Sequence, residues 1–381
     1  MHLPFFRNLV YILFLCAGIN ACNNEKKSDI PSIQISPEIS NVLCPLSEIV
    51  NEMGVVHLET TPQCLMGYFS FLIFIDDKTM IFKSNKSILV FDIRGEFLSK
   101  IESVGNGPGE YQTIVNAFVD QSSRTIYLVD YKDIKMYDFD GRYIKTILIP
   151  FPPGGLFRRG NGDLIVVCQQ KYNNPDREML YLLDSLFNVS HAFKSMNLDI
   201  CKDIQQNLFF AGTPYEIGGH LFYMEPFVDT IYEICDTTLR PHWYINLGKY
   251  KCETKDGINI SNNNRASLKK IPMLDIIETK NYFFIGYIYS QAKYRSIYDK
   301  NLKKLIFHAK FTREDFPDQA MPILGIKNDI IKNAPSFWPG YVKNNIVVEI
   351  VFPASMNDEQ LKEFNCKVDD NPILFIGTLK Q

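Results

Sequence analysis

Short apolar and aromatic runs, each closed by an aspartate and a tight turn, recur along the chain. Three of them share this order and occupy residues 87–97, 135–144 and 180–189. Their aspartates, Asp92, Asp138 and Asp184, are spaced by 46 residues in both steps. Gly95 and Gly141 supply the positive φ that a tight hairpin turn requires. The pattern predicts a repeated β-hairpin whose aspartate accepts hydrogen bonds from the turn amides.

A second pair of strands is expected upstream of each hairpin, within 71–82, 116–129 and 156–167. Four short strands in about 40–50 residues are typical of one blade of a β-propeller. Two further units with longer loops follow at 215–236 and 282–302, and their extra length lies largely in 249–275.

The last unit, 337–377, provides three strands, and the missing fourth strand is available at 55–60. A ring of blades must close, and sharing one blade between the two ends removes exposed sheet edges. We therefore predict an all-β fold: a six-bladed β-propeller over residues 55–381, its last blade closed by an N-terminal strand. Residues 356–366 are expected to form a short helix capped by Asn357.

The first 21 residues have the pattern of a secretory signal peptide. Arg7 precedes an apolar run, 9–17, that is too short to span a bilayer. Ile19-Asn20-Ala21-Cys22 resembles a bacterial lipobox, in which the cysteine becomes the lipid-bearing first residue. We expect residues 1–21 to be removed, Cys22 to carry a lipid anchor, and residues 22–54 to form a linker. A plain signal peptide with an incidental Cys22 is the alternative.

Composition narrows the class of protein further. The chain is 46% hydrophobic and 22% charged, which excludes a disordered chain. A formal net charge of −3 argues against a nucleic-acid partner. The 28 Phe and 20 Tyr favour strands, and we expect most of them to fill the wedges between blades.

One string of residues resembles a known family. Gly105-Asn106-Gly107-Pro108-Gly109-Glu110-Tyr111 is similar to the G-x-G-P-G-E-Y signature of six-bladed, NHL-like β-propeller lipoproteins of Bacteroidota. Weaker similarities lie at 56–60, 229–232, 337–339 and 371–374, in the same order. The resemblance implies a six-bladed propeller and little about its biochemistry. Pro108-Gly109 also suits the central positions of a type II turn.

Catalytic and metal signals are sparse. No His-Glu-x-x-His, nucleophile elbow, Walker loop or dinucleotide fingerprint is present, so no cofactor or metal is expected. Glu110, Tyr111 and Trp338 are the candidate binding residues, although each also suits a structural role between blades. Seven cysteines follow Cys22 without a C-x-x-C pair, and we expect most to be small buried residues.

These observations favour a monomeric lipoprotein of the cell envelope, on the outer membrane, facing the periplasm or the cell surface. The propeller is expected to bind a glycan, peptide or protein partner at one end of its channel. The alternative is an enzyme, a lyase or hydrolase acting on a glycan or peptide at the channel mouth. Histidines or acids converging at that mouth would favour the enzyme.

Overall fold

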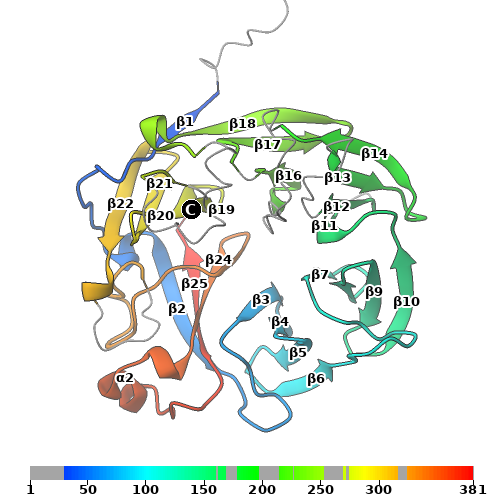
Figure 1. The fold of residues 1–381 in the computed structure, drawn as a ribbon. Helices are drawn as coiled ribbons and strands as arrows, with labels where there is room; N and C mark the ends of the chain where they lie inside the picture. Colours follow the sequence, from blue (N-terminus) through cyan, green and yellow to red (C-terminus); the bar gives the residue numbers. More distant parts are fainter. Residues whose placement is uncertain are drawn as a thin grey trace, which may run out of the picture.

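The computed structural model describes residues 30–159, 162–168, 178–196, 214–225, 227–252, 269–271, 274–315 and 324–380. Six sheets surround a central axis, each sheet forming one blade (Figure 1). The fold is therefore the predicted six-bladed β-propeller. No helix in these ranges is long and apolar enough to cross a membrane.

Blades 1 to 3 each contain four antiparallel strands, which follow one another in sequence from the channel to the outer rim. Blade 1 contains β3 (Ser70–Ile75), β4 (Thr79–Ser84), β5 (Ser87–Asp92) and β6 (Phe97–Ile101). Blade 2 contains β7 (Asn116–Asp120), β8 (Thr125–Val129), β9 (Asp133–Asp138) and β10 (Tyr143–Leu148). Blade 3 contains β11 (Pro153–Arg158), β12 (Leu164–Cys168), β13 (Glu178–Leu183) and β14 (Val189–Lys194).

The N-terminal segment adds an outermost strand to blade 4 and to blade 6, and it contacts the outer strand of blade 5. Blade 4 contains β15 (Tyr215–Ile217), β16 (His220–Tyr223), β17 (Thr230–Cys235), β18 (Thr238–Asn246) and, outermost, β1 (Ser32–Gln34). Blade 5 contains β19 (Leu274–Glu278), β20 (Tyr282–Tyr289), β21 (Ala292–Asp299) and β22 (Lys304–Phe311). Blade 6 contains β23 (Tyr341–Lys343), β24 (Ile346–Val351), β25 (Ile373–Leu379) and β2 (Val50–His57).

The ring closes through β2, the predicted N-terminal strand, which lies beside β25 in Figure 1. The two strands pair antiparallel from Val50↔Leu379 to His57↔Ile373. The strand begins at Val50, earlier than the expected 55–60, because its first residues continue the same ladder.

The segment before β2 is not a plain linker, which corrects the expected boundary at residue 55. β1 pairs in parallel with β18, and a 3-10 helix, η1 (Leu46–Glu48), precedes β2. Ile33, Ile35 and Leu46 are fully buried. The apolar side chains in this segment are sufficient to hold it against the propeller, so the packed part of the chain begins near residue 31.

The aspartates of the repeat close the hairpin turns as predicted. Asp92 Oδ1 accepts hydrogen bonds from the amides of Arg94 and Glu96, both at 2.9 Å. Asp184 Oδ1 accepts from Leu186 and Asn188, also at 2.9 Å. These backbone bonds hold the pKa of Asp184 below its ordinary value.

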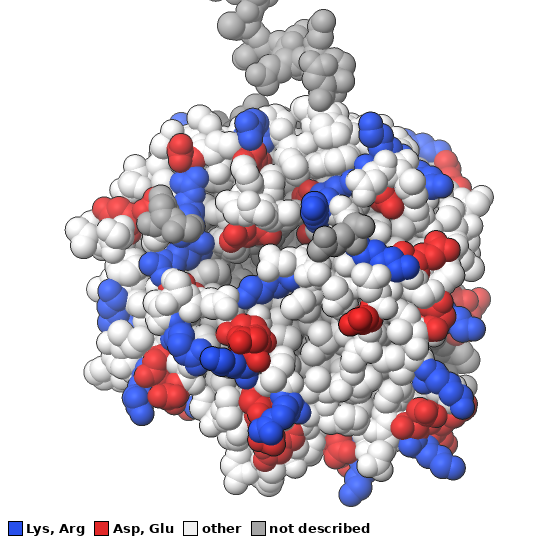
Figure 2. All heavy atoms as spheres, turned by 180° about the vertical axis from the view of Figure 1, so that it is seen from behind, with Lys and Arg blue, Asp and Glu red and all other residues white. Residues whose placement is uncertain are grey.

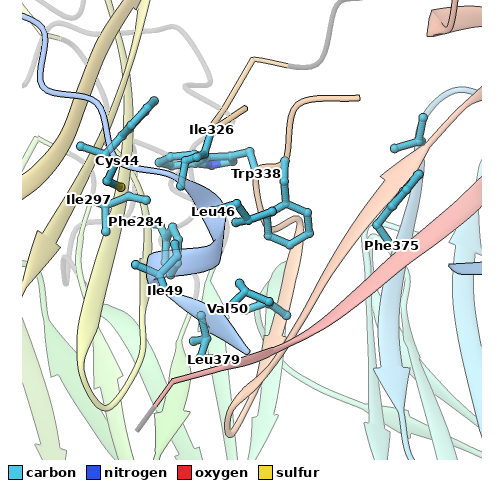
Figure 3. Packing of buried hydrophobic residues seen from close by; sticks show 14 of the residues in the cluster. Cys44, Leu46, Ile49, Val50, Phe284, Ile297, Ile326, Trp338, Phe375 and Leu379 are labelled. Atoms are coloured by element: carbon cyan, nitrogen blue, oxygen red, sulfur yellow. The ribbon is translucent and has the colours of Figure 1, made fainter. Parts of the chain in front are cut away.

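The hydrophobic core consists of six clusters, one at each junction between neighbouring blades. The cluster between blades 5 and 6 gathers Leu46, Phe284, Trp338 and Phe375 from four separate segments (Figure 3). Aromatic side chains therefore fill the wedges between blades, as the composition suggested.

The C-terminal part of the chain adds the one predicted helix, α2 (Asp358–Glu363), on the rim of blade 6. Asn357 caps it: the Asn357 side chain accepts from the Gln360 amide at 2.9 Å, and the Gln360 side chain accepts from the Asn357 amide. Short 3-10 turns lie at η2 (Gly248–Tyr250), η4 (Arg313–Asp315) and η5 (Pro353–Ser355).

Candidate functional site

The innermost strand of every blade borders a central cavity of about 1650 Å³. These strands are β3, β7, β11, β15, β19 and β23. Ligand pockets in proteins usually measure about 300–1,000 Å³, so the space is large enough for an oligomeric ligand or a protein loop. We take this channel as the candidate functional site.

Charges of both signs line the channel. Six acidic residues, Asp120, Glu216, Glu225, Asp229, Asp275 and Glu278, face six basic ones, Arg158, Arg159, Lys251, Lys280, Lys343 and Lys380. Positive and negative side chains also alternate over the molecular face shown in Figure 2. The channel therefore has no field of one sign that would attract a polyanion or a polycation.

Most of the channel carboxylates already bind donors of this chain. Asp229 Oδ2 lies 2.6 Å from Lys251 Nζ, and Asp275 Oδ2 lies 3.2 Å from Arg295 Nη1. Asp120 accepts hydrogen bonds from Arg158 and Ser122. These three carboxylates therefore have ionic or hydrogen-bond partners within the chain itself.

Glu278 is a buried channel acid, 5% exposed, and lies between blades 4 and 5. Its carboxylate accepts from the Tyr215 hydroxyl at 2.7 Å, from His242 Nε2 at 3.0 Å and from Lys300 Nζ. Burial alone would raise the pKa of Glu278, but the bond from His242 and the charge of Lys300 hold that pKa below its ordinary value. The carboxylate also raises the pKa of Tyr215, in addition to the effect of burial. Glu278 is thus a fixed anion that joins two blades.

A second glutamate, the half-buried Glu349 of β24, lies on the other side of blade 5. Its Oε2 accepts the Trp338 amide at 3.1 Å, and the Arg295 guanidinium stacks over the Trp338 ring at 4.7 Å. Burial raises the pKa of Glu349 to about 8, against the smaller opposing effects of the Trp338 amide and the Arg295 charge. Gly286 leaves room for Arg295, since a Cβ there would lie 2.4 Å from Nη1.

The candidate residues Tyr111 and Trp338 lie in the core and not on the channel wall. Tyr111 is 1% exposed, and its hydroxyl donates to the carbonyl oxygens of Lys86 and Ile101 at 2.7 and 3.2 Å. Trp338 is 5% exposed and packs edge-on against Phe284 at 5.6 Å. Neither ring is accessible to a ligand, because the wedges between blades enclose both.

Glu110 is exposed but serves the turn that contains it. Its carboxylate accepts the Gly107 amide at 2.7 Å, and its own amide donates to the Gly107 carbonyl at 3.0 Å. Gly109 has φ +76°, which completes the type II turn expected for Pro108-Gly109. The Tyr137 hydroxyl of blade 2 donates to the Gly109 carbonyl. The motif therefore ties blade 1 to blade 2.

Sequence reasoning did not find the Glu278 cluster. Tyr215, His242, Glu278 and Lys300 come from four strands or turns of two blades and share no spacing. Only the folded ring brings them together. In the described part of the chain, no three His, Cys, Asp or Glu side chains gather as metal ligands would.

Comparison with known proteins places the chain in a family. The model of the domain of unknown function DUF4934 matches residues 30–378. The chain belongs to the DUF4934 family. The match starts at residue 30, so this DUF4934 domain includes β1 and η1 as well as the ring.

Solved structures support the same fold. A candidate exported protein from Bacteroides fragilis superposes with a TM-score of 0.68 at 19% identity, covering 92% of this chain and 100% of that one. Virginiamycin B lyase from Staphylococcus aureus is a more distant likeness, with a TM-score of 0.37 at 11% identity over 68% of this chain and 74% of that one. No curated protein matches this DUF4934 chain.

Proposed function

We propose that this DUF4934 protein is a lipoprotein of the cell envelope, anchored through Cys22, that binds a ligand in its central channel. Three features support the anchor: the signal-like residues 1–21, the lipobox-like Ile19–Cys22 sequence, and a structural neighbour described as exported. The protein acts as a monomer on the outer membrane.

The single observation that carries the binding role is the channel itself. It is a cavity of about 1650 Å³, lined by mixed charges, neutral polar groups and aromatic rings. Five of its six acids accept hydrogen bonds or ion pairs from donors of the same chain, which hold their side chains in place. A glycan, a peptide or a loop of a protein fits such a mixed surface. The rival role, a lyase or hydrolase, would need acids that are available to a substrate.

Glu216 is the channel acid best suited to a binding test, because it is exposed on β15 and no hydrogen bond of its side chain is observed in the described residues. A soluble fragment starting at Ser28 is screened against glycan and peptide arrays. Glu216→Lys should weaken binding of any channel ligand at least tenfold, and the same change at exposed Glu52 on the outer rim should not. Equal loss in both variants, or loss in neither, would place the ligand elsewhere.

Cys22→Ala tests the anchor separately. The variant should move from the membrane fraction to the soluble fraction after cell lysis, since the lipid is the only anchor that we propose. Retention of the variant in the membrane fraction would contradict lipidation at Cys22.

A further inference from the structure

The segment from Ile30 to Ile49, which we name the strap, runs along the outer rim from blade 4 to blade 6. It begins at β1, where Ser32 pairs with Tyr244 and Gln34 with Asn246 of β18. Hydrogen bonds extend the pairing on both sides, from the Tyr244 amide to Pro31 at 2.9 Å and from the Ile35 amide to Asn246 at 3.0 Å. The first contact of the strap is therefore with blade 4.

The strap then crosses blade 5. Val42 and His308 of β22 exchange two backbone hydrogen bonds, at 2.9 and 2.8 Å. Leu46 and Ile49 are buried in the cluster between blades 5 and 6, and Ser47 Oγ donates to Asp329 at 2.6 Å. The chain thus first contacts the ring at blade 4, two blades before blade 6, whose sheet it completes with β2.

Because the strap is packed against the ring, little free chain is left between Cys22 and the propeller. A free linker from residue 22 to 54 could extend over about 110 Å, at about 3.3 Å per residue, and would impose no orientation. The packed strap leaves seven residues between Cys22 and Ile30, and the eight Cα-to-Cα steps from Cys22 to Ile30 can span about 30 Å at most. A compact chain of this size is about 50 Å across. The tether is therefore shorter than the molecule that it holds.

From this we infer that the anchored protein holds the blade 4 rim toward the lipid surface and the blade 1 rim away from it. Blades 1 and 4 are opposite in the ring, as β6 and β1 show in Figure 1. In this orientation neither channel mouth faces the bilayer, so both open to solvent. The inference rests on the lipid anchor of the proposed function.

The test measures the distance of two rim positions from the membrane. The full-length lipidated protein is reconstituted in phosphatidylethanolamine–phosphatidylglycerol vesicles that carry a headgroup acceptor dye. A donor dye is attached through a ketone-bearing amino acid at exposed Gln34 of β1 or at Leu98 of β6, which is 55% exposed. Energy transfer should be roughly twofold or more stronger from Gln34, because the two rims differ in height by about one molecular diameter.

Two variants serve as controls. Insertion of about 20 Gly and Ser residues after Asp29 should abolish the difference, since a long flexible tether fixes no orientation. Ile33→Asp together with Ile35→Asp should reduce it, because β1 then separates from β18; the insertion alone suffices if this variant fails to fold.

Equal transfer from both positions on vesicle-bound wild-type protein, or stronger transfer from Leu98, would overturn the orientation while leaving the anchor intact. Failure of the wild-type protein to float with the vesicles would instead overturn the anchor, and the orientation with it.

Discussion

Two glutamates on opposite sides of blade 5 respond to burial in opposite ways. Glu278, between blades 4 and 5, meets Lys300, His242 and Tyr215, and its pKa falls. Glu349, between blades 5 and 6, meets one backbone amide and a more distant Arg295, and its pKa rises to about 8. Burial disfavours a charge in both places, so the number and charge of the donors decide which form is held. Near neutral pH, one junction contains an ion pair and the other a protonated acid.

The largest effect is expected from removing the cation at the first junction. Lys300→Met leaves the Glu278 charge buried without its ionic partner and should lower the free energy of unfolding by about 3–5 kcal/mol. Urea unfolding at pH 7 measures this. The double variant Glu278→Gln/Lys300→Met should recover most of the loss, because it leaves no uncompensated charge. A double variant no more stable than the single one would show that Lys300 acts mainly through its packing over Phe283 at 4.5 Å.

An intermediate effect is expected from pH at the second junction. The folded pKa of Glu349 lies above its ordinary value of 4.5, so its contribution to stability is complete below about pH 4.5. That contribution is lost as pH rises toward 8, with a slope of at most about 1.4 kcal/mol per pH unit. Glu278, with a lowered pKa, behaves in the opposite way: its contribution is present above its unfolded pKa and is lost in acid.

The variant Glu349→Gln removes the pH-dependent contribution of Glu349 and leaves that of Glu278 in place. Glutamine cannot ionise, so the variant should gain stability relative to the wild type as pH rises from 6 to 9. Thermal unfolding across this range measures the difference. A difference that is constant with pH would mean that Glu349 does not titrate there.

The smallest effect concerns the neutral donor on Glu278. Tyr215→Phe removes one of the three hydrogen bonds to Glu278. It should lower the free energy of unfolding by about 1–2 kcal/mol, which is less than the effect of Lys300→Met. Tyr341→Phe is the matched control, because Tyr341 lies on another inner strand, β23, and does not contact Glu278. If Tyr215→Phe lowers the free energy of unfolding as much as Lys300→Met does, then the charge of a donor does not decide how much it contributes at Glu278.

Much of the ring could be predicted from local sequence. Hairpins at Asp92, Asp138 and Asp184 are coded by residues within a few positions of each other, since the aspartate and the turn amides that it binds are neighbours. The cap Asn357 and the turn Pro108-Gly109 are local for the same reason. The closure by β2 was predicted because a three-stranded unit at one end and a lone strand at the other can only complete each other.

The sequence predicts a binding site in the channel, but neither the strap nor the residues that line the channel could be predicted from it. Residues 30–49 contain only short apolar stretches, and their burial depends on β18, β22 and the junction of blades 5 and 6, which lie far away in the chain. Residue type favours Glu110, Tyr111 and Trp338 as binding residues, but their placement depends on which side of a strand or turn faces the channel.

The sequence by itself thus determined the repeat, the blade number and the closing strand, because period, turn chemistry and edge pairing act over short distances. Only the tertiary structure decided which acids meet a cation, which aromatic rings face the wedge, and where the chain leaves the rim. Those outcomes depend on contacts between blades, and such contacts exist only once the ring has closed.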